Sequence, residues 1–257
     1  MAEASNNLTR RTLLRRAAAG AAAATGLDLT AGQTTNGKEP DDLEKYDFLL
    51  PRVKFRPEEG PEDYWSVYYE GDRNLLRAFS SVIRCKVKLK ADCRGQSEPE
   101  CRFNAVVEFD DFETLRKHPF LFMTSQYHYK LNATEKKNLK RYIETGGFLL
   151  MDDCISQSRG VFFYQSSYEL LEEVFGKPAL RPIPHEHEVF HNVYDFGEGG
   201  VPHCYGTYHR AKGVFVDDRL AVFLSSTDIH CAWVGNHRLV KEGTHMGVNI
   251  LMYALSH

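Results

Sequence analysis

Two carboxylates and a thiol follow one another directly where an apolar segment of the chain ends. Asp152, Asp153 and Cys154 come after Gly147-Phe148-Leu149-Leu150-Met151, a composition typical of a buried strand. In open α/β sheets ligands bind beyond the carboxyl ends of the strands, so these residues stand where chemistry is usual. Paired carboxylates there could act as general acid and base, or hold a divalent metal through oxygen ligands.

Further acidic and imidazole side chains could join this pair. Asp228 follows another predicted strand, and Glu186 and His187 lie on the irregular segment between the two strands. If these strands are parallel, all of these groups could converge at one rim, where His187 could share the acid–base work. The alternative is structural, because an Asp at a strand end commonly caps the next helix or closes a turn. The sequence leaves both interpretations open.

A zinc motif is also present letter for letter. His187-Glu188-Val189-Phe190-His191 matches H-E-x-x-H, which on a helix supplies two zinc ligands and a general base. Pro184 could open such a helix and Gly197 could close it. No Gly-x-x-His continuation follows His191, and we interpret the match as a coincidence.

A capped helix and a glycine turn would position the first carboxylates. Asn132-Ala133-Thr134-Glu135 is a capping signature, and Gly146 fits the left-handed position that ends a helix. The apolar segments Pro119–Thr124 and Phe148–Met151 flank this helix. Together they predict a βαβ unit with a right-handed crossover.

The remaining elements are predicted from apolar periodicity and turn residues. Strands are expected at 49–55, 85–89 and 105–109 and on both sides of an Asp217-Asp218-Arg219 turn, and helices at 62–82, 168–175 and 244–255. Residues 177–206 are rich in Pro, His and Gly and are expected to be irregular.

The first 47 residues differ from the rest of the chain. Arg10 and Arg11 are followed by two leucines, further basic residues and an alanine-rich run, which resembles a twin-arginine export signal. The alternatives are an Ala-rich helix or a mitochondrial-type presequence. We expect a signal peptide at 1–32, a flexible linker at 33–47 and one α/β domain at 48–257. The twin-arginine translocase would then be a partner during export to the periplasm or the exterior.

Composition and charge are those of a globular protein and argue against nucleic-acid binding. The chain has 257 residues, 42% of them hydrophobic, and a net charge of −3, which are ordinary values for a globular protein. The sequence has no basic stripe interleaved with aromatic residues, so a nucleic-acid partner is not expected. Six cysteines fit an oxidising compartment, where Cys93 and Cys101 could staple a hairpin loop.

Several motifs occur together in an order that resembles domain-of-unknown-function family 4159, a group of bacterial, often exported domains related to the class I glutamine amidotransferase fold. They are Asn74-Leu75-Leu76-Arg77, Pro119–Thr124, Gly146–Asp153, Glu186-His187, Asp218–Val222, Ser226–Trp233 and Met246–Ile250. The resemblance implies a flavodoxin-like three-layer sandwich, a mostly parallel sheet with helices on both faces. It implies no activity.

The chain departs from the pattern of these relatives at two places. Ser125 and Gln126 stand where the family usually has Gly and His. Aligned with an amidotransferase, Asp153 falls near the position of the nucleophile and Cys154 one place later, and an Asp cannot replace a thiol in amide transfer. We therefore interpret Cys154 as a buried thiol or as half of a disulfide, for example with Cys231.

Three function classes follow. The first is a ligand-binding or assembly module of a bacterial envelope system, whose partner is a small ligand or an envelope protein, with Gln126, Glu186 and Trp233 as ligand contacts. The second is a hydrolase that uses an acidic crevice, with or without a metal. The third is a zinc metalloprotease. For Trp233 and the aromatic group Tyr64, Trp65, Tyr68 and Tyr69, packing is the alternative to ligand contact.

Overall fold

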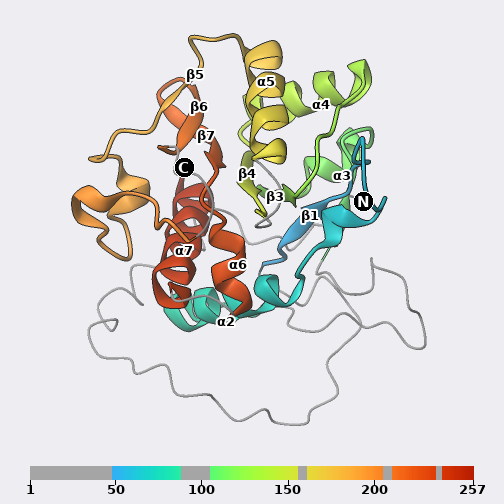
Figure 1. Ribbon diagram of the computed structural model, residues 1–257. Coiled ribbons are helices and arrows are strands. Elements are labelled where there is room, and N and C mark those ends of the chain that lie inside the picture. The colour runs from blue at the N-terminus through green and yellow to red at the C-terminus, as the bar shows by residue number, and fades with distance from the viewer. Residues whose placement is uncertain (1–47, 88–104, 156–160, 205–209, 236–238) are drawn as a thin grey trace, which may run out of the picture.

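The computed structural model describes residues 48–87, 105–155, 161–204, 210–235 and 239–257 (Figure 1). The predicted export signal at 1–32, the linker at 33–47 and the loop from Cys93 to Cys101 lie outside these ranges. Within them, no helix is both long enough and apolar enough to cross a lipid bilayer.

Seven strands form one mixed sheet in the order β2-β1-β3-β4-β7-β6-β5. The five strands from β2 to β7 are parallel, β6 is antiparallel to β7, and β5 is antiparallel to β6. Counted along the chain, the parallel strands follow the flavodoxin-like order 2-1-3-4-5. The strands are β1 (Pro51–Val53), β2 (Ala105–Val107), β3 (Phe120–Ser125), β4 (Phe148–Asp153), β5 (Leu180–Pro182), β6 (Lys212–Val216) and β7 (Arg219–Ser225).

Helices cover both faces of the sheet and complete three layers (Figure 1). The face under α2, α6 and α7 is separate from the face under α3, α4 and α5, and each has its own apolar core. The helices are η2 (Tyr64–Ser66), α2 (Glu70–Ile83), α3 (Phe112–Leu115), α4 (Ala133–Glu144), α5 (Phe162–Phe175), η4 (Glu188–Phe190), η5 (Gly197–Gly199), α6 (Ile229–Val234) and α7 (Val240–Ser256). The predicted three-layer α/β class is confirmed.

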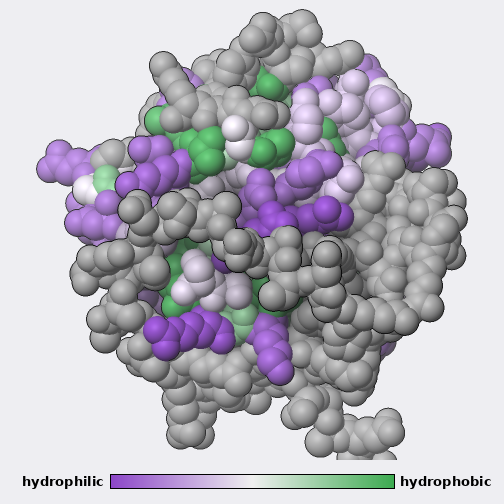
Figure 2. All heavy atoms as spheres, turned by 90° about the horizontal axis from the view of Figure 1, so that it is seen from below, coloured by the Kyte–Doolittle hydropathy of each residue, from purple (hydrophilic) through white to green (hydrophobic). Residues whose placement is uncertain are grey.

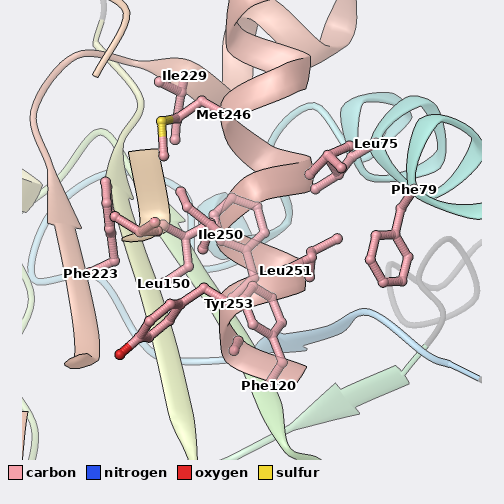
Figure 3. Close-up of a cluster of buried hydrophobic side chains, with 14 of the residues drawn as sticks. Leu75, Phe79, Phe120, Leu150, Phe223, Ile229, Met246, Ile250, Leu251 and Tyr253 are labelled. Carbon is pink, nitrogen blue, oxygen red and sulfur yellow. The ribbon is translucent and has the colours of Figure 1, made fainter. Parts of the chain in front are cut away.

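Strands β3 and β4 are buried on both faces because helices cover them on both sides. Side chains alternate across a strand, so Phe120 and Phe122 join the core under α7, while Leu121 and Met123 join the core under α4 and α5. Figure 3 shows the first of these cores, where residues of β3, β4 and β7 meet α2 and α7.

The predicted βαβ unit of β3, α4 and β4 is confirmed. Asn132 and Glu135 form the reciprocal capping box at the start of α4. The helix ends in a turn where Gly146 adopts a φ of 104°, which favours glycine. The N–H of Gly147 then donates to the carbonyl of Tyr142 over 2.9 Å, and β4 begins at the next residue.

Other predicted elements have different bounds. The helix expected at 62–82 is divided into η2 and α2, and the helix expected at 168–175 begins earlier, at Phe162. The described part of the strand expected at 85–89 is limited to an isolated bridge between Phe48 and Val87. The segment 177–206, expected to be irregular, contains β5, η4 and η5. Helix α6 was not predicted, since six residues are too few for a helical period to stand out.

Candidate functional site

Three aspartates gather at the carboxyl ends of the neighbouring strands β4 and β7. Asp152 and Asp153 end β4, Asp228 follows β7, and all three are at most 1% exposed. Because side chains alternate, Asp152 points toward α6 and Asp153 toward α5. The N–H of His230, near the start of α6, donates to Asp152 over 2.9 Å, and that of Tyr164 in α5 donates to Asp153 over 2.7 Å. Asp152 and Asp153 therefore each hold the N-terminus of a helix, as the structural interpretation expected, whereas the side chain of Asp228 makes no such bond.

Each of the three carboxylates has one oxygen that accepts a hydrogen bond and one oxygen that does not. The Oδ2 atom of Asp228 accepts from the N–H of Ile155 over 3.2 Å. The Oδ1 atoms of Asp152, Asp153 and Asp228 are all buried and have no hydrogen-bond partner among the described residues. A buried unsatisfied oxygen is destabilising by about 1 to 3 kcal/mol, more for a charged group. Helix capping does not account for three such oxygens at the carboxyl ends of neighbouring strands.

Burial and mutual repulsion raise the pKa values of these carboxyl groups. Burial raises the pKa of Asp153 to about 8 and that of Asp228 to about 6. The pKa of Asp152 is well above its ordinary value because the group is buried, with Asp228 and Asp153 adding like-charge repulsion. Additional negative charge is unfavourable here, whereas a cation or a proton donor is stabilising.

Asp228 has a left-handed backbone, with a φ of 56° and a ψ of 47°, in the turn between β7 and α6. This conformation is uncommon for a residue other than glycine and is often found at functional sites. The alignment with the amidotransferase pattern placed Asp153 near the nucleophile, which in those enzymes stands on a tight turn after a strand. That interpretation is corrected, since Asp153 is the last residue of β4 and pairs with Ser125 of β3.

Two thiols adjoin the carboxylates. The Sγ atoms of Cys154 and Cys231 lie 3.8 Å apart, and one carboxylate oxygen of Asp228 lies within 4.8 Å of both. The amide nitrogen of Gln126 approaches the Cys154 sulfur at 3.7 Å. Hydrogen bonding to Cys154 and burial raise the pKa of Cys231. Together, Cys154, Asp228 and Cys231 could hold a metal ion.

The two cysteines are neighbours, as expected, but they form no disulfide. Among the described residues, Cys85 and Cys204 likewise take part in no disulfide. A disulfide requires the sulfurs to be about 2.05 Å apart, far closer than they are.

Tyrosines lie beside the thiols. The rings of Tyr64 and Tyr127 meet edge to face with centroids 4.8 Å apart. Burial raises the pKa values of Tyr64 and Tyr68, and the neighbouring Cys154 and Cys231 add to this. Tyr68 is 44% exposed. In Figure 2, which looks from below toward this end of the sheet, hydrophobic patches lie beside strongly hydrophilic side chains. By contrast, the Trp233 ring is buried and donates through Nε1 to the carbonyl of Gly243, so its role is packing.

His187 does not join the aspartates. Its ring packs against Phe215 and Tyr253, with centroids 5.8 and 5.0 Å away. The Tyr253 hydroxyl accepts from the N–H of Leu220, near the beginning of β7, whereas Asp228 follows the end of that strand. His187 and its neighbour Glu186 therefore lie near the amino ends of the parallel strands, opposite the aspartates. The expectation of one common rim is wrong for these two residues, because the segment that carries them crosses back to the amino ends of the parallel strands.

The H-E-x-x-H residues do not form the helix that the zinc motif requires. Only the short helix η4 is present, and His187 caps it by accepting from the N–H of Val189. Both ring nitrogens of His191 are engaged, with the carbonyl of His185 at 2.7 Å and with Asp195 at 2.8 Å. These contacts leave the two imidazoles in structural roles.

A buried charged network beside the site was not predicted. The guanidinium of Arg52, in β1, donates twice to the carboxylate of Asp72, in α2, over 3.0 and 2.9 Å. It also donates to Nε2 of His230 over 3.0 Å, and both Arg52 and His230 are fully buried. Burial alone would raise the pKa of Asp72, but the guanidinium of Arg52 lowers it. An arginine inside an apolar strand was the available signal.

A protein-family model described as a domain of unknown function (DUF4159) matches residues 59–255. The chain belongs to this family. The match includes the three aspartates, both thiols, and the helices α5 and α6, whose N-termini Asp153 and Asp152 hold. No curated protein matches the chain.

Proposed function

We propose that this member of the DUF4159 family is an exported, ligand-binding module related to the glutamine amidotransferases but without their cysteine nucleophile. The flavodoxin-like strand order supports that relationship. The arginine pair and alanine-rich segment before residue 33 support export and a role in a bacterial envelope system.

One observation supports binding above all. Asp152, Asp153 and Asp228 each keep one buried carboxylate oxygen without a partner, at the strand ends where α/β proteins bind ligands. A ligand that presents an ammonium or guanidinium group would satisfy these acceptors. Tyr68 and the half-buried Tyr64 offer aromatic surface beside them.

A thermal-shift experiment on the full chain tests this proposal. The probes are spermidine, arginine and glucosamine, compared with uncharged glycerol and anionic citrate. A cationic probe at 100 times its Kd would stabilise the protein by about 2.7 kcal/mol. Asp153→Asn, which keeps the oxygen that the Tyr164 N–H needs, should lose this shift. Asp217→Asn, an exposed turn residue, is the matched control and should keep it. Equal shifts in both variants, or none with any cationic probe, would reject the proposal.

A hydrolase is the second candidate, favoured by the left-handed turn that carries Asp228. Nucleophiles of α/β hydrolases stand on such a turn between a strand and a helix, and a carboxylate can form a covalent ester with substrate. Against it, His187 is at the other edge of the sheet and His230 is engaged with Arg52. Chromogenic esters and phosphates test this candidate: it requires turnover that Asp228→Asn abolishes and Asp217→Asn retains.

A further inference from the structure

We propose that Cys154, Asp228 and Cys231 form a binding site for Zn²⁺, with one coordination position open. This inference goes beyond the organic ligand proposed above, with which it shares only Asp228. The three residues come from two neighbouring strand ends: Cys154 directly follows β4, Asp228 follows β7, and Cys231 lies three residues later in α6.

The spacing of the two sulfurs fits the geometry of zinc. Two thiolates bound at about 2.3 Å with a tetrahedral angle of about 109° have sulfurs about 3.8 Å apart. The Sγ atoms of Cys154 and Cys231 are 3.8 Å apart. All three ligand atoms lie within 4.8 Å of one another, so one ion could contact them together after small side-chain movements.

The carboxylate provides an independent observation. Asp228 is 1% exposed, and its Oδ1 atom has no hydrogen-bond partner within the described parts of the chain. Its other oxygen is fixed by the N–H of Ile155. A carboxylate with one oxygen anchored and the other free is the arrangement in which an outer contact orients a metal ligand.

The ligand types select the metal. Thiolates favour Zn²⁺ over Mg²⁺ and Ca²⁺, which prefer oxygen ligands alone. Binding of Zn²⁺ forms two Zn–S bonds and one Zn–O bond, while each thiol releases its proton to solvent. No oxidant or reductant is required. The amide of Gln126, 3.7 Å from the Cys154 sulfur, lies beside the site.

Titration of the reduced, metal-free full chain with Co²⁺, followed by displacement with Zn²⁺, tests this proposal. Binding of one equivalent should produce thiolate-to-cobalt charge-transfer absorption and the visible bands of a tetrahedral ion. Cys231→Ser and Asp228→Asn should each weaken binding at least tenfold, by the loss of one ligand. Cys85→Ser is the matched control, because Cys85 is a buried cysteine outside the group and in no disulfide, and this variant should bind normally.

Three outcomes would overturn the proposal: absence of the thiolate band, its persistence in both site variants, or its loss in Cys85→Ser. Cys231 is only partly buried, so its replacement by Ser should fold, and circular dichroism checks this. Asp153→Asn separates the two proposals. It should keep the cobalt bands while losing the response to cationic probes, so failure of either proposal leaves the other testable.

Discussion

At the scale of residues, Arg52 and Asp72 form a two-point ion pair inside the protein, with side chains 0% and 6% exposed. Arg52 also donates to the carbonyls of Trp65 and Val67 and lies over the ring of Phe122 at 4.5 Å. One side chain thus connects β1, η2, the start of α2 and β3. The network holds His230, and with it the beginning of α6, at a fixed distance from the sheet.

Asp72→Asn should lower the free energy of unfolding by about 3 to 5 kcal/mol, because it leaves the buried guanidinium without a counter-charge. Urea denaturation at neutral pH measures this change. Glu62→Gln is the control, since Glu62 pairs with Arg56 in solvent and such pairs contribute about 0 to 1 kcal/mol. A loss below 1 kcal/mol in Asp72→Asn would show that the pair is not a structural requirement.

His118 should make stability depend on pH. Burial, with the nearby charge of Lys117, lowers the pKa of His118 from 6.5 to about 4. Between these values the unfolded chain binds the proton and the folded chain does not. Stability due to His118 is therefore complete above pH 6.5 and falls as the pH decreases toward 4, by up to about 1.4 kcal/mol per pH unit.

His118→Gln removes this titration. The difference in unfolding free energy between the wild type and the variant should narrow or change sign as the pH falls from 7 to 4.5. Parallel pH profiles for the two proteins would contradict the argument.

At the scale of elements, α4 depends on its first residues. Asn132 accepts from the N–H groups of Thr134 and Glu135, and Glu135 accepts from the N–H of Asn132. These contacts satisfy N–H groups that have no partner within a helix. The helix in turn fixes where β4 begins, and β4 carries Asp152 and Asp153.

Asn132→Ala should lower the free energy of unfolding by about 1 kcal/mol through loss of this cap. Lys137→Ala, an exposed change on the same helix, should have little effect. Thermal unfolding of the two variants provides the comparison. An effect no larger in Asn132→Ala than in Lys137→Ala would mean that water replaces the cap at little cost.

At the scale of the whole molecule, one face is closed by α7 packing against α6 and α2. Gly243 and Gly247 allow this approach. A Cβ atom on Gly247 would lie 2.6 Å from Leu75 and 2.9 Å from the ring of Trp233, distances too short for either side chain to remain in place. The layer that carries His230 and Cys231 is thus held close to the sheet by the absence of two side chains.

Gly247→Ala should be destabilising, although alanine is about 1 kcal/mol better than glycine inside a helix. Overpacking costs about 1 to 3 kcal/mol, so a net loss near 1 kcal/mol is expected. Denaturation of the single variant and of the double variant with Leu75→Ala tests the cause. The penalty of Gly247→Ala should shrink once Leu75 is shortened, and an unchanged penalty would exclude this contact.

The sequence by itself determined the local parts of this protein. The Asn132 cap, the Gly146 turn and the apolar strands of the βαβ unit were predicted correctly, because each signal acts within a few residues. The motif order also identified the family. The same reasoning placed acidic residues at strand ends, where Asp152 and Asp228 are found.

Only the tertiary structure decided which of these residues meet. Strand β7 lies next to β4 despite the long segment between them, and this brings Cys231 to Cys154 and His230 to Asp152. The same connection carries His187 to the amino ends of the parallel strands, away from the aspartates. Side-chain periodicity fixes the face of a strand or helix on which a residue lies, whereas strand order fixes its neighbours, and that order depends on contacts between distant segments.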